Sequence, residues 1–237
     1  MVDYLELSPG ACRELDDAGF TVVAGPVPLK SLAKLAAAYD AATKSASPED
    51  VSVGSSTTHV SDLVNRGSEF DGLYVHPPVL KACCRVLNGP FRLSTMHART
   101  LRPKVPAQDL HVDYECDSHG WTMVGFIFMV DESRANNGAT RFLPGSHLWP
   151  TVPHELIVDP KADYPGQVLA CGPVGSMIVF NGWVWHGHTA NCPDEPRRSI
   201  QGAYTRRKAT SGFDLPANAK RNALRHQPNG EISGWLD

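Results

Sequence analysis

The chain has 237 residues, of which 42% are hydrophobic and 20% charged, and its formal net charge is -3. A chain of this size and composition can bury a substantial core within one domain. The small negative charge, without any long basic run, excludes nucleic acid and anionic membranes as first candidates for a partner. The longest apolar run, near residues 124–130, is too short to cross a bilayer.

Cysteine usage and the N-terminus predict the compartment. The six cysteines form no C-x-x-C pair, and Cys83 and Cys84 are adjacent, which does not suit an ordinary disulfide framework. Reduced thiols inside a cell are the simpler interpretation. Residues 1–6 lack a basic region followed by an apolar segment, so no secretory signal is expected. We therefore expect a cytoplasmic protein.

The first 90 residues predict mainly helices. Proline in the first helical position, glycine after the last turn and apolar residues at helical spacing mark their boundaries. We expect helices over 9–18, 29–44 and 77–87 and a strand over 20–23. Residues 45–58 are rich in Ser, Thr, Gly and acidic residues, which predicts a mobile loop, either a solvated connection or a lid over a pocket.

After residue 90 the pattern changes to short strands separated by Gly, Pro, Asn and Asp. The expected strands cover 91–100, 122–130, 140–143, 167–170, 176–180 and 199–205. Many short strands after a few helices predict an antiparallel sandwich or jelly-roll barrel with helices packed outside. We expect one domain over 1–237, with a helical part to about 90, a barrel over about 91–205, and a tail or helix over 206–237.

Three residues from two remote parts of the chain form a candidate metal site. His111 and Asp113 are two residues apart, so on an extended strand their side chains share one face. His186 sits in a strand-turn context that could deliver a second imidazole. Two histidines and one carboxylate on one side of a metal leave other positions open, which suits a non-haem Fe(II) oxygenase. A lone His-x-Asp is weak, and such residues often serve only as hydrogen-bonding groups at strand ends.

Two further features support an oxygenase. Arg197 lies eleven residues after His186, with Arg198 beside it. The arginine fork binds a carboxylate through two parallel hydrogen bonds, and neighbours on a strand face opposite ways, so one of the two can point inward. The segment 137–147 (NGATRFLPGSH) predicts a turn, a strand and a second turn, and it places Thr140 on a central strand.

Together these motifs resemble the phytanoyl-CoA dioxygenase family of Fe(II)/2-oxoglutarate oxygenases. The G-A-T-R-x-x-P-G-S-H segment resembles the branch that acts on secondary metabolites, and the resemblance spans about residues 10–205. The resemblance implies a mainly β fold with flanking helices, a double-stranded β-helix of the jelly-roll type. It also implies Fe(II), 2-oxoglutarate as co-substrate and dioxygen. The expected reaction hydroxylates, desaturates or epoxidises a small organic molecule while 2-oxoglutarate is decarboxylated to succinate.

The resemblance also implies roles for single residues. His111, Asp113 and His186 match the catalytic iron ligands, and the carboxylate of Asp113 argues against halogenation. Arg197 matches the arginine that binds the far carboxylate of 2-oxoglutarate. The remaining matches are co-substrate contacts at Gln108 and Thr140 and a pocket-lining position at Met96. Apart from the resemblance, we expect Met96 and Tyr114 to form the substrate wall. His188 departs from many relatives; it could contact 2-oxoglutarate or compete with His186 as metal ligand.

Other function classes stay open at this point. A cupin-like isomerase or hydrolase would need the three metal ligands but not Arg197. A silent relative would bind 2-oxoglutarate or another acid without turnover. Expected partners are a small-molecule substrate, with no nucleic acid and no membrane. The oligomeric state is open, and similar enzymes make a homodimer one alternative.

Overall fold

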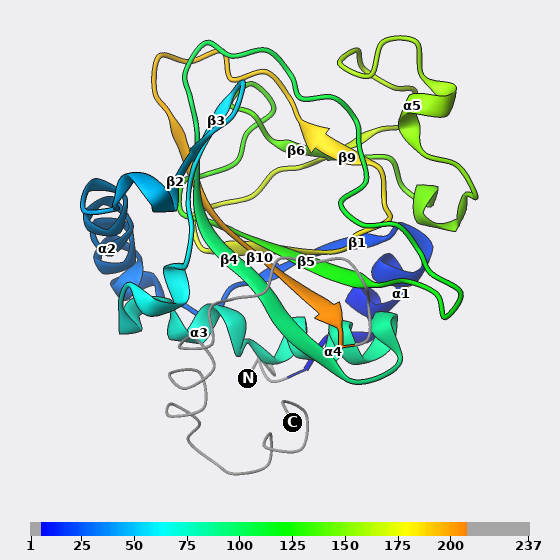
Figure 1. The fold of residues 1–237 in the computed structure, drawn as a ribbon, viewed down its shortest axis with the longest axis horizontal. Helices are drawn as coiled ribbons and strands as arrows, with labels where there is room; N and C mark the ends of the chain where they lie inside the picture. The colour runs from blue at the N-terminus through cyan, green and yellow to red at the C-terminus, as the bar shows by residue number, and fades with distance from the viewer. Residues whose placement is uncertain (1–5, 208–237) are drawn as a thin grey trace.

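The computed structural model describes residues 6–207, which form two antiparallel β-sheets with helices packed outside the larger sheet (Figure 1). Residues 1–5 and 208–237 lie outside the described residues, so all but the first two residues of the expected tail or helix over 206–237 do as well. Within the described residues, no helix has the length and apolar character needed to cross a membrane. All six cysteines are described, and none of them is paired in a disulfide.

The helices are α1 (Pro9–Asp17), α2 (Leu32–Lys44), α3 (Asp71–Tyr74), α4 (Pro77–Leu87) and α5 (Pro153–Leu156). The strands are β1 (Phe20–Ala24), β2 (Val51–Val53), β3 (Thr57–Val60), β4 (Phe91–Leu101), β5 (Met123–Met129), β6 (Thr140–Phe142), β7 (Val168–Ala170), β8 (Ser176–Asn181), β9 (His186–His188) and β10 (Arg197–Arg206). Every helix and strand expected within residues 6–205 is present within a few residues.

Local sequence explains the helix boundaries. The Ser8 hydroxyl accepts a hydrogen bond from the backbone N–H of Ala11 at 3.1 Å, and Pro9 occupies the first turn of α1. Asn88 ends α4 in the left-handed conformation, with φ of 46°, which asparagine tolerates better than most residues.

The strands form two sheets that do not close into a barrel, and β1 to β3, from the part of the chain expected to be mainly helical, join the larger sheet. The larger sheet has the order β1-β8-β5-β10-β4-β3-β2, and the smaller sheet has the order β7-β6-β9. The smaller sheet lies above the larger one in Figure 1, α3 and α4 lie below the larger sheet, and α2 and α1 lie to its left and right. This is a mainly β fold with flanking helices, built as a double-stranded β-helix whose sheets do not close on each other.

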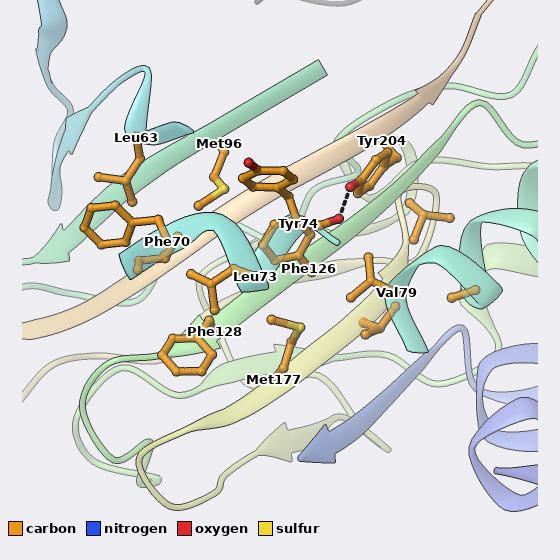
Figure 2. Packing of buried hydrophobic residues seen from close by; sticks show 14 of the residues in the cluster. Leu63, Phe70, Leu73, Tyr74, Val79, Met96, Phe126, Phe128, Met177 and Tyr204 are labelled. Atoms are coloured by element: carbon orange, nitrogen blue, oxygen red, sulfur yellow. Dashed lines mark hydrogen bonds between the residues drawn. The ribbon is translucent and has the colours of Figure 1, made fainter. Parts of the chain in front are cut away.

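Each face of the larger sheet has its own core. On the helix side, a cluster that includes Leu73, Val79 and Phe126 fills the space between the helices and the sheet (Figure 2). The Tyr204 hydroxyl donates a hydrogen bond to the Tyr74 carbonyl within this cluster. Between the two sheets, a smaller cluster includes Phe142 of β6. The larger sheet is therefore anchored on one side, and its other side is available for a site.

The loop prediction for residues 45–58 is wrong, because much of this segment is a hairpin. Strands β2 and β3 pair with each other, and β3 pairs with β4 at the edge of the larger sheet. Thr57 and Val60 are buried, whereas the residues of β2 are half-buried or exposed. Edge strands tolerate polar side chains, so a polar composition did not distinguish this hairpin from a loop.

Candidate metal centre

Backbone pairing brings two distant histidines side by side. The N–H of His111 donates to the carbonyl of His186 at 2.9 Å, and the N–H of His186 donates back at 3.0 Å. Because β9 is an edge strand of the smaller sheet, the segment around His111 extends that edge. Gly187 permits this close approach, since a Cβ there would lie 2.9 Å from the carbonyl oxygen of Asp109.

Asp113 faces both histidines. Its Oδ1 lies 3.7 Å from Nε2 of His111, and its Oδ2 lies 3.6 Å from Nε2 of His186. One ligand atom from each of the three residues lies within 4.8 Å of the others. The N–H of Asp113 donates to the Gly182 carbonyl at 2.9 Å, which holds this segment against the turn that precedes β9. The three side chains therefore converge on one point.

This donor set fits a divalent transition metal. The Nδ1 atoms of His111 and His186 lie 2.8 Å from the carbonyl oxygens of Asp109 and Val184. A carbonyl only accepts hydrogen bonds, so each Nδ1 carries the proton and each Nε2 presents its lone pair to the centre. Burial lowers the pKa of His186 to about 4, so this imidazole is neutral as a ligand must be. Two imidazoles and one carboxylate on one side of an ion match the ligand set of non-haem iron(II) oxygenases.

Arg197 extends from β10 toward the same interior. Its Nε donates to the Asn137 carbonyl at 3.1 Å and its guanidinium NH₂ to the Gly138 carbonyl at 2.6 Å. Gly138 has φ of 81° and packs against Leu101 so closely that a Cβ would collide with it. Arg197 is only 6% exposed, and no carboxylate of the described residues forms an ion pair with it. Burial lowers its pKa to about 10, so the guanidinium stays charged at neutral pH.

Arg198 points to the opposite face of β10. Its guanidinium donates to the carboxylate of Asp131 at 2.7 Å and to that of Asp40 at 2.8 Å. The alternation of a strand thus separates the two arginines. Arg197 lies in the interior beside the three candidate metal ligands, whereas Arg198 forms ion pairs away from them.

Arg99 of β4 adds a second, half-buried cation that the sequence interpretation missed. It donates to the side-chain oxygens of Gln108 at 3.1 Å and Gln201 at 3.2 Å. Burial lowers the pKa of Arg99, while the charge of Asp113 acts in the opposite direction. A usable signal was present in the sequence, because polar residues at every second position of β4 predict a polar face directed to one side.

Thr140 and His188 are cross-strand partners on β6 and β9. Nε2 of His188 lies 2.9 Å from the Ser56 hydroxyl, and its Nδ1 lies 2.8 Å from the Thr189 carbonyl. Ser56 lies in the turn between β2 and β3, so this bond ties the hairpin to the smaller sheet. The cluster of convergent ligand atoms contains His186 and not His188, so the alternative of His188 as metal ligand has no geometric support.

Arg141 holds the segment that leads to His111. It is fully buried and donates to the carbonyls of Gln108 at 2.8 Å, Pro160 at 2.7 Å and Ala162 at 2.6 Å. Arg141, the arginine of the G-A-T-R segment, therefore has a structural role. The sequence interpretation did not assign one. It fixes the backbone from which Gln108 and His111 project.

Two neighbouring cavities adjoin the three candidate ligands. A narrow cavity of about 40 Å³ is lined by Thr140, His188 and Arg197, among others. A wider and more open cavity of about 830 Å³ lies next to it. Arg99 and Gln108 line both, as do His111 and Asp113. A small acid bound between Arg197 and the metal centre would therefore lie beside a much larger space.

The two candidate substrate contacts separate. Tyr114 lines the wider cavity. Met96 does not, because it is fully buried in the cluster on the helix side of the larger sheet (Figure 2). Its neighbours Thr95 and His97 face the cavity, as strand alternation requires. The prediction of Met96 as a pocket-lining residue is wrong.

Comparison with known proteins identifies the family. A family model described as phytanoyl-CoA dioxygenase (PhyH) matches residues 15–199. The dioxygenase cdmA of Talaromyces verruculosus is 28% identical over 163 residues, which are 63% of this chain and 53% of the relative. The iron/alpha-ketoglutarate-dependent dioxygenase ausU of Aspergillus calidoustus is 26% identical over 205 residues, 78% of this chain and 67% of the relative. The chain spans about half to two thirds of the length of the relatives it matches.

A solved structure shares the fold. HygX from Streptomyces hygroscopicus, crystallised with nickel and 2-oxoglutarate, superposes with a TM-score of 0.70 at 15% sequence identity. The superposition covers 90% of this chain and 94% of that chain. The likeness confirms the double-stranded β-helix over nearly the whole described chain.

Proposed function

The chain belongs to the phytanoyl-CoA dioxygenase family, and from that premise we propose that it is an iron(II)- and 2-oxoglutarate-dependent oxygenase of a small organic molecule. The observation that carries the proposal is the convergence of His111, Asp113 and His186 beside the buried guanidinium of Arg197. A metal-binding jelly roll without oxygenase chemistry needs the three metal ligands but does not need a buried arginine beside them.

The three convergent residues would hold iron(II) from one side. The tautomers set by the two Nδ1–carbonyl contacts keep both Nε2 atoms available, and Asp113 supplies the negative charge. Iron bound there supplies the oxidative chemistry, in which 2-oxoglutarate and dioxygen give succinate, carbon dioxide and an oxidised substrate. The protein positions the reactants and shields them from water.

Arg197 would bind the far carboxylate of 2-oxoglutarate. It is buried and charged and bonds only to backbone carbonyls, so an incoming carboxylate would offset the cost of burying its charge. Thr140 and His188 line the same narrow cavity and would contact this end of the diacid. The same narrow cavity is also lined by His111, Asp113 and His186, so a diacid held by Arg197 at one end would direct its keto-acid end toward the triad.

Arg99 and Gln108 would serve the keto-acid end. They hydrogen-bond each other and line both cavities next to His111 and Asp113. A guanidinium there would offset the charge of the second carboxylate while Gln108 keeps the arginine in place. Asp113 would supply a ligand to the iron where a halide would otherwise bind, which favours oxygen transfer over halide transfer.

The proposal is tested by succinate release. Purified protein with iron(II), ascorbate and 2-oxoglutarate under air should form succinate slowly without substrate and faster with one, whereas Asp113→Ala should form none. A cupin-like isomerase or hydrolase, or a silent 2-oxoglutarate-binding relative, would form no succinate in the wild-type protein. A homodimer and a cytoplasmic location remain predictions; sedimentation at several protein concentrations checks the first.

A further inference from the structure

The wider cavity has two unlike halves. On β5 and β8 its wall is apolar and includes Met123, Ile127 and Phe180. On the neighbouring strands β4 and β3 the wall is polar and includes Thr95, His97 and His59. The inward face of the larger sheet therefore changes from apolar to polar along its width, next to the metal centre.

Two histidines form the centre of the polar half. The rings of His59 and His97 stack at 4.9 Å between centroids with an interplanar angle of 8°. Nε2 of His59 lies 2.9 Å from the Thr57 hydroxyl. Nε2 of His97 is buried and has no hydrogen-bond partner among the described residues. One hydrogen-bonding atom at this wall is thus left for a partner from outside the chain.

Both rings are neutral at physiological pH. Burial lowers the pKa of His59 to about 4, and the nearby charge of Arg99 acts in the same direction. Burial lowers the pKa of His97 to about 3, with His59 and Arg99 adding to the effect. The two imidazoles therefore offer hydrogen bonds without a net charge.

The wider cavity also lacks an unused positive charge. Among the described residues that line it, Arg99 is the single arginine or lysine, and the proposed function assigns its charge to the keto-acid end of 2-oxoglutarate. Apart from the candidate ligand Asp113, the one lining carboxylate is Glu115, which is exposed. A negatively charged substrate would lose its hydration without gaining a counter-charge.

We propose that Thr95, His97 and His59 select an uncharged, bulky substrate by hydrogen-bonding its hydroxyl or ketone oxygens. The apolar part of that molecule packs against Met123, Ile127 and Phe180, opposite the polar strip. Neutral imidazole and hydroxyl groups each donate and accept, so they suit groups that do both. This proposal rests on the proposed function for the reaction that the bound substrate undergoes. The binding contacts themselves can form without any reaction. Acyl thioesters that carry phosphates are excluded by the same lack of free cations.

The test measures binding without turnover. Three probes share one ring skeleton of suitable bulk: testosterone, the corresponding steroid 17-carboxylate and the corresponding 17-amine. Each is titrated calorimetrically into protein loaded with iron(II) and 2-oxoglutarate under nitrogen. The neutral probe should bind at least about tenfold more tightly than either charged probe, since a buried unpaired charge is costly. Equal binding by all three, tighter binding by a charged probe, or no binding of the neutral probe would overturn the proposal.

Variants assign the effect to the polar strip. His97→Phe keeps a stacked ring and removes the nitrogens, so it should lower the affinity for testosterone about tenfold. His97→Gln should recover part of this loss. Thr95→Val removes a hydroxyl at nearly constant shape and should lower the affinity for testosterone several-fold. His154→Phe, on the exposed α5, is the matched control and should change nothing. If Thr95→Val and His97→Phe both bind testosterone like the wild type, the strip does not select it.

Calorimetric titration of the wild-type protein with iron(II) and 2-oxoglutarate, run beside the probe titrations, separates the two claims. Loss of 2-oxoglutarate and iron binding in the wild type, with selective probe binding retained, would refute the proposed function alone. Normal 2-oxoglutarate binding with unselective probe binding would refute the selection alone.

Discussion

Two adjacent arginines show how one residue step along a strand separates two roles. Arg197 lies buried beside the candidate metal ligands with only backbone carbonyls as partners. Arg198 forms ion pairs with Asp131 and Asp40 on the other face of β10. Both side chains are arginines, so only their surroundings differ. Those surroundings predict different effects when each arginine is replaced.

Arg197→Met should weaken 2-oxoglutarate strongly, because truncating one partner of a buried, hydrogen-bonded charge pair costs roughly 2–5 kcal/mol, which is about 30-fold or more in affinity. Arg198→Met is the matched control. It should lower the free energy of unfolding by roughly 1–3 kcal/mol, through lost hydrogen bonds to charged groups, and leave 2-oxoglutarate affinity unchanged. Calorimetric titration and urea denaturation measure the two quantities. The reverse pattern, with co-substrate affinity following Arg198, would contradict the assignment.

Asp113 is the residue on which the metal centre depends most. Asp113→Ala removes the one carboxylate between two imidazoles and should abolish succinate formation and iron binding. The far-ultraviolet circular dichroism should stay that of the wild type, because Asp113 is partly exposed and packs in no core cluster. His154→Ala, at an exposed position on α5, is the control. Succinate formation by Asp113→Ala at the wild-type rate would remove the basis of the proposed function.

At the scale of elements, the β2–β3 hairpin has a structural role that its composition concealed. The guanidinium of Arg102 donates to the carbonyls of Gly54 at 3.0 Å and Thr57 at 3.3 Å and also to that of Ser55. The hydroxyl of Ser56, in the same turn, bonds to His188 of β9. The turn is thus held from both sides, and His188, its partner on β9, lines the narrow cavity.

Arg102→Met should release this turn. We expect faster amide hydrogen exchange over residues 51–60 and a several-fold weaker 2-oxoglutarate affinity, because the Ser56–His188 bond loses its support. Mass spectrometry after deuterium labelling measures the exchange. Arg85→Met is the control, since Arg85 pairs with Asp16 on the surface and such exposed pairs contribute little. Unchanged exchange in Arg102→Met would show that the turn does not need the arginine.

The elements that could be predicted from the sequence are those with local signals. Ser8-Pro9 and Asn88 mark the ends of helices through backbone chemistry alone, and the alternation of β10 separates Arg197 from Arg198. The features that could not be predicted depend on contacts between residues that are far apart in the sequence. The Ser56–His188 bond joins positions 132 residues apart. Met96 was misassigned because the face of β4 that meets the helices is decided by packing; the polar residues Thr95, His97 and Arg99 mark the other face.

For the whole molecule, several buried histidines link stability to pH. The pKa values of His59 and His97 are about 4 and about 3 in the fold, against roughly 6.5 in an unfolded chain. Above pH 6.5 these residues are neutral in both states and contribute no pH dependence. Below it the unfolded chain binds protons that the fold does not, so stability falls as the pH falls toward about 4 to 3.

Urea denaturation of metal-free protein checks this dependence. Each such histidine should contribute roughly 2 kcal/mol of lost stability between pH 6.5 and 5, at about 1.4 kcal/mol per proton and pH unit. His97→Phe should therefore show a smaller loss over this interval than the wild type, and His154→Phe should show the same loss as the wild type. An identical pH dependence in His97→Phe and the wild type would mean that folding does not lower the pKa of His97.

The most direct measurement of the central claim is the visible absorption of protein titrated with iron(II) and 2-oxoglutarate under nitrogen. A keto acid that chelates iron through two oxygens gives a charge-transfer band, and no primary substrate is needed to see it. We predict a band that saturates at one iron and one 2-oxoglutarate per chain, is absent in Asp113→Ala, and requires far more 2-oxoglutarate in Arg197→Met. No band in the wild-type protein, or an undiminished band in Asp113→Ala, would contradict the account.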